Sequence, residues 1–255
     1  MNTRTQNFFS FIGGNAVLSQ EIARELFRRP FYFDLLFSQI KSIGVRSIPL
    51  VFVVASSVGM VMALQFGIGL EKFGGKLYIP KLVSVSIIRE LGPVFTSLMF
   101  TARVGAGIAS EVASMVVTQQ IDALRALGTS PIKRVVIPRV IACMISLPLL
   151  SVMANTIGVL GGLVVGTSDL GLDPGFYFQK IQSSVFLADY FSGFCKTFFF
   201  SFFVSIPSCY FGLTTERGTR GVGDATTRAV VTSSILILVG DYFLTKLFWI
   251  FESWR

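Results

Sequence analysis

Five ionisable residues stand inside stretches of the sequence that are otherwise apolar: Arg89, Glu90, Arg103, Glu111 and Asp241. A charge inside a bilayer is costly unless it is paired or hydrated, so each of them needs a partner or a function. The adjacent Arg89 and Glu90 could reach lipid headgroups as a pair, or could line a cavity. Arg103 and Glu111 are about two helical turns apart, which favours structural bridges to neighbouring helices or subunits. Asp241 could pair with Arg89 or line the same cavity.

The residue types that carry most enzyme chemistry are missing or isolated. There is no histidine, which removes the commonest general base and metal ligand. Cys143, Cys195 and Cys209 stand singly in apolar runs, a pattern typical of small buried residues and not of disulfides or a zinc site. The nearest approach to a nucleotide-binding loop, Gly74–Leu77, lacks the hydroxyl residue that such a loop needs. We therefore expect a chain that is not an enzyme and binds no metal or cofactor of its own.

The elements that must position the charges are membrane-spanning helices. Of the 255 residues, 52% are hydrophobic and 14% are charged. Several apolar stretches reach the roughly 20 residues that a helix needs to cross a bilayer, where lipid offers no other partner for backbone amides. The predicted fold is an all-α integral membrane protein with a single domain over residues 1–255. The five predicted spans are residues 48–70, 83–117, 135–165, 190–213 and 229–251.

Prolines predict irregularities within these spans. The second span is longer than a bilayer requires, so we expect it to tilt, to project beyond the membrane, or to break near Gly92 and Pro93. Pro138 and Pro148 predict bends in the third span.

The segment before the first span mixes apolar and charged side chains. Residues 15–47 predict an amphipathic helix lying in the membrane interface, divided into two pieces by Pro30. Residues 1–14 lack the basic region, long apolar core and A-x-A site of a cleaved signal peptide. Direct insertion into a bacterial cytoplasmic membrane is the simpler interpretation.

Lysine and arginine are distributed unevenly over the connecting segments. If the N-terminus lies in the cytoplasm, most basic residues lie on the inner side of the membrane. They belong to the N-terminal segment, to residues 118–139 and to the polar loop 214–228. The outer side would keep a few lysines, with Lys196 and Lys246 near span ends. The net charge of +8 is therefore interpreted as a signal for topology and lipid headgroups, and not for nucleic acid.

The connection between the second and third spans has the pattern of a short helix. Residues 118–131 would begin at Thr118 as N-cap and end at Gly128, with Pro131 beyond. Ile121, Leu124 and Leu127 would form a narrow apolar edge on it.

Several motifs together resemble one family. They are Arg89-Glu90-Leu91-Gly92-Pro93, Ala102-Arg103-Val104-Gly105-Ala106, Ile108-Ala109-Ser110-Glu111, Gln120-Ile121-Asp122-Ala123-Leu124, Pro138-Arg139 and the block Gly218–Val231. The chain is similar to the MlaE/YrbE family of ABC-transporter permeases from Asn15 to Trp249. It departs from the family's pattern at Gln119, where the family often has Glu.

That resemblance implies a homodimer of subunits with an interfacial helix and five spans. Its partners would be a cytoplasmic ABC ATPase, which uses ATP and Mg, a periplasmic MCE-domain protein and sometimes a STAS-domain subunit. The helix within 118–131 would be the coupling helix that docks on the ATPase. The residues implied for coupling are Thr118, Gln120, Ile121, Asp122, Leu124 and Arg125.

The implied substrate is a phospholipid, moved between the inner membrane and the MCE carrier for outer-membrane lipid homeostasis. A phospholipid site would combine apolar walls with a few cations. Met62, Leu70 and Phe73 could supply walls, and Arg89 could bind phosphate, with Glu90 and Asp241 beside it. For the apolar three, ordinary helix packing is the alternative interpretation.

Two other classes of protein stay open on the sequence. Glu90, Glu111 and Asp241 would suit an ion-gradient-driven secondary carrier of lipophilic substrates, although such carriers usually have more spans and internal symmetry. A membrane-bound lipid-modifying enzyme is disfavoured because the sequence has neither histidine nor a nucleophile motif.

Overall fold

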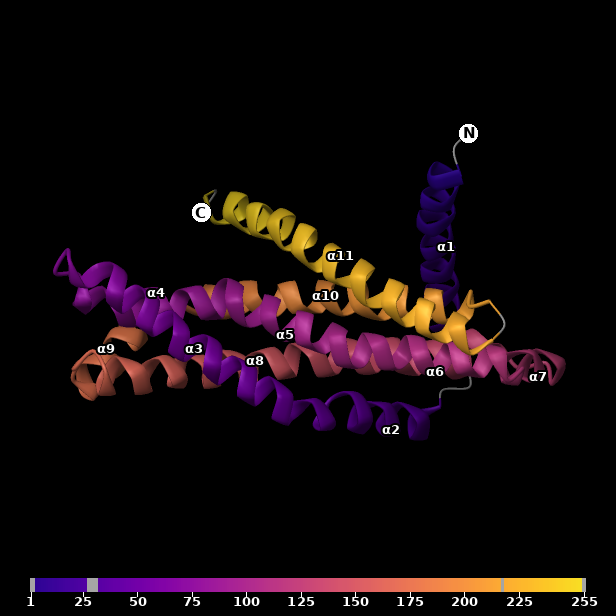
Figure 1. The fold of residues 1–255 in the computed structure, drawn as a ribbon, viewed down its shortest axis with the longest axis horizontal. Helices are drawn as coiled ribbons and strands as arrows, with labels where there is room; N and C mark the ends of the chain where they lie inside the picture. The colour runs from indigo at the N-terminus through magenta and orange to yellow at the C-terminus, as the bar shows by residue number, and fades with distance from the viewer. Residues whose placement is uncertain (1–2, 27–31, 217, 254–255) are drawn as a thin grey trace. The chain divides into compact units, whose positions relative to one another are not determined.

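The chain folds into long helices that could cross a membrane (Figure 1). The computed structural model describes residues 3–26, 32–216 and 218–253, which form helices and no strand. Among these residues, five helical stretches are long and apolar enough to span a bilayer. They are Phe33–Glu71, Lys76–Val117, Ile132–Ser168, Leu187–Leu213 and Thr219–Phe251. With the N-terminal helix α1 (Thr3–Leu26), they confirm the predicted all-α membrane fold.

The N-terminal segment consists of two helices. After α1 comes α2 (Phe33–Ile43), and the short turn η1 (Val45–Ser47) joins α2 directly to α3 (Ile48–Glu71). The helical stretch that contains the first span therefore begins at Phe33, before the predicted start at residue 48. The predicted break at Pro30 lies outside the described residues.

The second stretch contains η2 (Lys76–Tyr78), α4 (Ile79–Ser86), η3 (Ile87–Leu91), α5 (Gly92–Phe100), η4 (Thr101–Gly105) and α6 (Ala106–Val117). The break predicted near Gly92 and Pro93 is instead the π-helical segment η3, in which the Gly92 amide donates to the Ile87 carbonyl five residues back. Proline has no amide hydrogen, and a wider turn lets the chain remain helical beside it. The π-helical segment η5 (Ile132–Val136) precedes Pro138 in the same way.

The remaining helices are α7 (Gln120–Ala126), α8 (Ile137–Ser168), α9 (Pro174–Ser184), α10 (Leu187–Leu213) and α11 (Thr219–Ser253). The prediction of a polar loop over residues 214–228 was wrong for most of that range. Because α11 begins at Thr219, its first turns carry Arg220, Asp224 and Arg228 on a helix. Pro148 lies inside α8, which continues through it.

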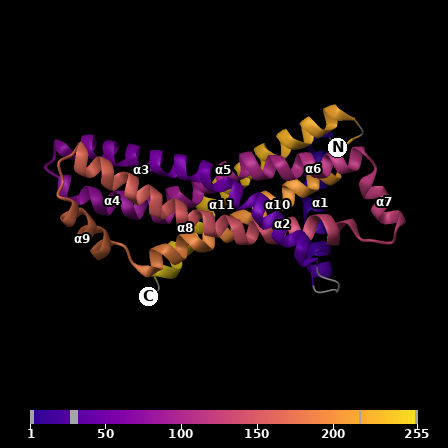
Figure 2. The same ribbon diagram turned by 90° about the horizontal axis from the view of Figure 1, so that it is seen from below.

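The helices belong to two compact units. The first contains residues 1–45, 100–146 and 200–237, and the second contains residues 46–99, 147–199 and 238–255. In the second unit α3, α4 and α9 lie side by side with the C-terminal half of α8 (Figures 1 and 2). Tyr177 of α9 is completely buried in the core between them, and burial raises its pKa to about 12, so the phenol stays neutral at ordinary pH.

Glycines allow α3 and α8 to approach closely in this second unit. A Cβ on Gly59 would overlap the backbone of Gly158, whereas a Cβ on Gly69, on the same helix, would meet nothing within 4 Å. We expect Gly59→Leu to destabilise the protein by about 1–3 kcal/mol, because the two backbones would have to separate. Gly69→Leu is the matched control and should leave the thermal unfolding midpoint in detergent unchanged or slightly raised. Equal midpoints for the two variants would contradict the close packing.

Candidate functional site

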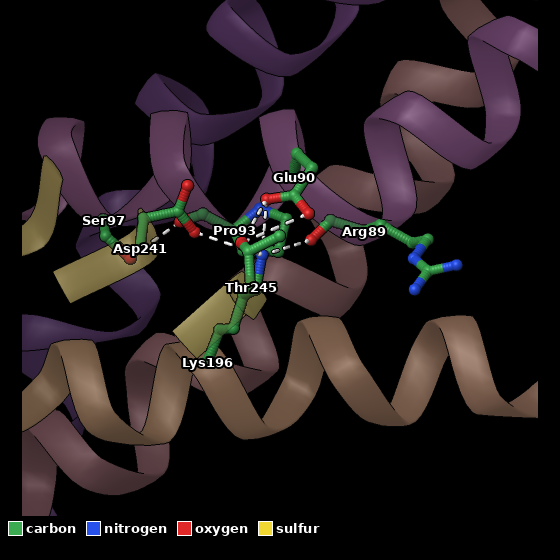
Figure 3. A network of polar contacts seen from close by, with 7 residues as sticks. All are labelled: Arg89, Glu90, Pro93, Ser97, Lys196, Asp241 and Thr245. Atoms are coloured by element: carbon green, nitrogen blue, oxygen red, sulfur yellow. Dashed lines mark hydrogen bonds and ion pairs between the residues drawn. The ribbon is translucent and has the colours of Figure 1, made fainter. Parts of the chain in front are cut away.

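Lys196 is the centre of a group of polar side chains in the second unit (Figure 3). Its side chain is completely buried, and its Nζ donates a short hydrogen bond to Glu90 Oε2 and a second one, 2.7 Å long, to Thr245 Oγ1. Asp241 Oδ1 lies 3.2 Å from the same nitrogen, at ion-pair distance. We call Lys196, Glu90, Asp241 and Thr245 the Lys196 cluster. One buried ammonium thus connects α10 to η3 and to α11.

Local helix geometry puts the four residues in reach of one another. On α11, Asp241 and Thr245 are four residues apart and so lie on one face. On the second stretch, Pro93 cannot donate the amide hydrogen that a regular helix would give to the carbonyl of Arg89. That carbonyl instead accepts a 3.2 Å hydrogen bond from Lys196 Nζ. The π-helical segment therefore provides both a carboxylate and a backbone acceptor for the buried lysine.

The charge of Lys196 does not balance the charge of its neighbours. Two carboxylates, Glu90 and Asp241, face a single ammonium. The Glu90 side chain is 36% exposed. Thr245 adds a hydroxyl that also donates to Glu90 Oε2 over 3.2 Å. The acids are thus stabilised by the lysine, by one hydroxyl and by the solvent or headgroups that Glu90 can reach.

Arg89 has a different acidic partner from the one considered in the sequence. Its Nη1 lies 3.3 Å from Oδ1 of Asp189, a residue that is 6% exposed. The other oxygen, Asp189 Oδ2, accepts a 2.8 Å hydrogen bond from the Phe186 amide immediately before α10. Such a carboxylate in the first turn satisfies an amide that the helix leaves unpaired. Asp189 therefore has two roles: one carboxylate oxygen stabilises the start of α10, and the other orients the Arg89 guanidinium.

Arg89 also lines an open hollow of about 600 Å³. Its other walls are Leu187, Ala188, Phe191, Ser192, Phe248 and Phe251, from the first turns of α10 and the last turns of α11. We call it the Arg89 hollow. Large apolar side chains around one guanidinium are what an amphiphile with a phosphate group would require.

The structure does not bring together all the residues predicted for a lipid cavity. Of the six predicted residues only Arg89 lines the Arg89 hollow; the other five, which do not, are Met62, Leu70, Phe73, Glu90 and Asp241. Met62 is half-buried, Leu70 packs against the hydrophobic core around Tyr177, and Phe73 is 84% exposed after the end of α3. For Asp241 the sequence left open a pairing with Arg89 or a place in the cavity, and the structure puts it at ion-pair distance from Lys196.

Bridging roles for the charges of the first unit were predicted, and one bridge is visible. Glu111 of α6 forms an ion pair of 3.0 Å with Arg139 of α8, which joins two neighbouring helices. Arg139 also donates to the Val135 carbonyl over 2.8 Å. Arg103 lies in the π-helical segment η4.

The predicted coupling segment contains the short helix α7, although it does not begin as expected. Thr118 is not the N-cap, because it ends α6 and its hydroxyl donates to the Ser114 carbonyl over 2.8 Å. Gln119, with φ of 59°, adopts the left-handed conformation between α6 and α7. Gly128, with φ of 70°, follows the helix end, as predicted.

One face of α7 packs against the protein and another is exposed. Ile121 is 3% exposed, whereas Leu127 just after the helix is 77% exposed. Asp122 and Arg125 form an exposed ion pair of 3.1 Å, and Gln120 donates to the Thr118 hydroxyl. Leu124 is half-buried. Asp122 and Arg125 therefore offer charges to a partner, and Leu127, just after the helix, offers a large apolar side chain.

Sequence reasoning missed two functional candidates, Lys196 and Asp189. Lys196 was placed near a span end because the fourth span was predicted to begin at residue 190, whereas α10 begins at Leu187 and buries Lys196. Asp189 stands immediately before the predicted start of the fourth span at residue 190. The signal that could have found them was charge: in the predicted spans Glu90 and Asp241 needed a cation, and Arg89 needed an acid. Within the described part of the chain, no group of three His, Cys, Asp or Glu side chains is arranged to hold a metal ion.

Comparison with known proteins gives a consistent result over most of the chain. A family model described as permease MlaE matches residues 36–247. A probable ABC transporter permease protein of Rickettsia conorii is 42% identical over 245 residues, which cover 96% of this chain and 95% of that protein. A probable ABC transporter permease protein of Synechocystis is 38% identical over 209 residues, with coverages of 82% and 80%.

A relative with a more specific description is the intermembrane phospholipid transport system permease protein MlaE of Haemophilus influenzae. It is 35% identical over 217 residues, which cover 85% of this chain and 83% of that protein. The region matched by the family model, residues 36–247, includes the Lys196 cluster, Arg89 and α7, whereas Phe248 and Phe251 of the Arg89 hollow lie just beyond it. The chain therefore belongs to the MlaE family of ABC-transporter permeases, multi-pass membrane subunits that are not themselves enzymes.

Proposed function

We propose that this permease moves phospholipids between the bacterial inner membrane and an MCE-domain carrier protein, in support of outer-membrane lipid homeostasis. The observation that carries the proposal is the Arg89 hollow, in which a guanidinium oriented by Asp189 faces a wall of leucine and phenylalanine side chains. A phosphate group would bind Arg89 while an acyl chain packs against Phe191 and Phe248. The relative from Haemophilus influenzae is described as a phospholipid transport permease, which supports the same substrate class.

Energy would come from a partner subunit. An ABC permease works with an ATPase, and we propose that a cytoplasmic ATPase using ATP and Mg docks on the exposed face of α7 around Asp122 and Arg125. The assembly would contain two copies of this chain, the periplasmic MCE protein and, in some systems, a STAS-domain subunit. The N-terminus and α7 would lie on the cytoplasmic side, in agreement with the excess of basic residues there.

The buried charges have a place in this proposal that does not require an ion gradient. The Lys196 cluster ties α11 to η3 and α10, the elements that also form the Arg89 hollow. A nucleotide-driven change that shifts α11 would change the shape of that hollow. The family assignment favours this interpretation over an ion-driven carrier and over a lipid-modifying enzyme.

Replacement of Arg89 tests the proposed lipid site. In proteoliposomes that contain the partner ATPase and the MCE protein, we expect Arg89→Gln to reduce phospholipid transfer about tenfold or more, because a hydrogen bond to a charged group contributes roughly 1.5–3 kcal/mol. Arg46→Gln, at an exposed arginine outside the hollow, is the matched control.

A double variant separates binding of phosphate from a structural role of the pair. Arg89→Gln with Asp189→Asn leaves no unpaired acid behind, so it should restore stability but not transfer. Full transfer by the double variant would mean that Arg89 serves only to neutralise Asp189, and the proposed phosphate site would be wrong.

A further inference from the structure

A second open hollow, of about 430 Å³, lies in the first unit between α2, α6, α7 and the beginning of α8. It is lined by Arg134, Arg139 and Gln39, and by Leu35, Leu124 and Leu127 among other apolar residues. None of the described residues that line it is an Asp or a Glu. We call it the Arg134 hollow. Its combination of two cations with apolar walls matches an anionic amphiphile.

The two arginines that line this hollow differ in exposure and in how many of their donors the protein uses. Arg139 is 11% exposed and uses its two terminal nitrogens on Glu111 and on the Val135 carbonyl, while its buried Nε–H has no acceptor among the described residues. An acceptor for this Nε–H would be stabilising, and a bound phosphate would reach it only after a shift of the Arg139 side chain, because the nitrogen has almost no exposed surface. Arg134 is exposed, with its guanidinium carbon 5.9 Å from the centre of the Tyr32 ring.

The position of the hollow selects among possible anions. Three spanning stretches end beside it, since one starts at Phe33, one stops at Val117 and one starts at Ile132. The ends of spanning helices lie at the level of lipid headgroups. The charged outer face of α7, with Asp122 and Arg125, is not part of the lining. An anion in this hollow would therefore be a membrane lipid, and a protein partner would have the outer face of α7 to bind.

We propose that the Arg134 hollow binds the headgroup phosphate of an anionic phospholipid, with Arg134 and Arg139 on the phosphate and Leu35 and Leu124 on the upper acyl chain. This is a resident lipid, distinct from the lipid that is transported. Because Gln120, Leu124 and Leu127 of the α7 segment line the same hollow, the bound lipid holds that segment against α2 and α8. The consequence for coupling to the ATPase rests on the proposed function, whereas binding of the lipid does not.

Binding is tested on the full-length permease alone, without ATPase or nucleotide. Native mass spectrometry after delipidation would measure retention of added phosphatidylglycerol against phosphatidylcholine. We expect the wild type to retain phosphatidylglycerol preferentially, and Arg134→Gln and Gln39→Glu each to reduce that retention about tenfold, the first by removing a cation and the second by adding a repelling carboxylate. Arg46→Gln removes an exposed arginine that does not line the hollow and is the matched control.

Hydrogen exchange of residues 118–131 supplies a second readout. Phosphatidylglycerol should slow their amide exchange in the wild type and in Arg46→Gln, but not in Arg134→Gln. Equal retention by all variants, or unchanged exchange on addition of the lipid, would overturn the proposal. Displacement of phosphatidylglycerol by millimolar inorganic phosphate would show a general anion site and would overturn the assignment to a lipid. Failure here leaves the Arg89 transfer assay unaffected, so the two proposals fail separately.

Discussion

Lys196→Met is expected to abolish lipid transport and to destabilise the permease by about 3 kcal/mol, the lower end of the range for breaking a buried ion pair. The variant keeps the length of the side chain but leaves Glu90 and Asp241 facing each other without a cation, and the carbonyl of Arg89 without its donor. The lower end applies because Glu90 is partly exposed and can be hydrated. Thermal unfolding in detergent and transfer to the MCE protein would be measured together.

A neutral version of the whole Lys196 cluster separates packing from function. Lys196→Met combined with Glu90→Gln and Asp241→Asn removes all three charges, so most of the lost stability should return. If the charges only hold the helices together, transport returns as well; if α11 moves by exchanging these contacts, transport stays low.

The matched control for Lys196→Met is Lys76→Met. It removes an exposed ion pair in which Lys76 Nζ lies 2.8 Å from Glu71 Oε1. Exposed pairs contribute little, so we expect a change below about 1 kcal/mol. A loss of stability at Lys76 as large as at Lys196 would contradict the assignment of Lys196 as the buried centre.

Leu127→Asp is the second variant with a large expected effect, because it should uncouple the permease from its ATPase. Leu127 is 77% exposed just after α7, so its replacement should not affect folding, but a carboxylate would prevent its burial in a protein partner. Because Leu127 also lines the Arg134 hollow, retention of phosphatidylglycerol by the variant permease alone would be measured beside its association with the ATPase. We expect association with the ATPase to weaken at least tenfold, with a parallel loss of lipid-stimulated ATP hydrolysis. Asp122→Ala should act in the same direction with a smaller effect, since its present ion pair is exposed.

The matched control for this second variant is Leu77→Asp, at a leucine that is 57% exposed in the turn η2. It makes the same chemical change outside α7 and should leave both association and hydrolysis unchanged. Normal coupling by Leu127→Asp and Asp122→Ala would mean that α7 is an ordinary connection and that the ATPase binds elsewhere.

The helical fold could be predicted from residue types because the solvent for most of the chain is lipid. An apolar stretch of about 20 residues has only one common way to satisfy its backbone in a bilayer, which is a helix. Five spanning stretches therefore follow from hydropathy, and their ends were misplaced mainly where α2 runs into α3 and where α11 extends back to Thr219. A terminal turn rich in polar residues is helical only if neighbouring helices support it, and hydropathy does not report that support.

The candidate site was only partly predictable for a related reason. The sequence by itself determined that Arg89, Glu90 and Asp241 lie in spans and need partners, and the motifs around them determined the family. The tertiary structure decided that the partners are Asp189 and Lys196, the latter 106 residues from Glu90 along the chain. Pairing between helices depends on their rotation about their own axes, and each π-helical turn rotates every residue after it. Packing sets that rotation, and no local pattern of residues records it.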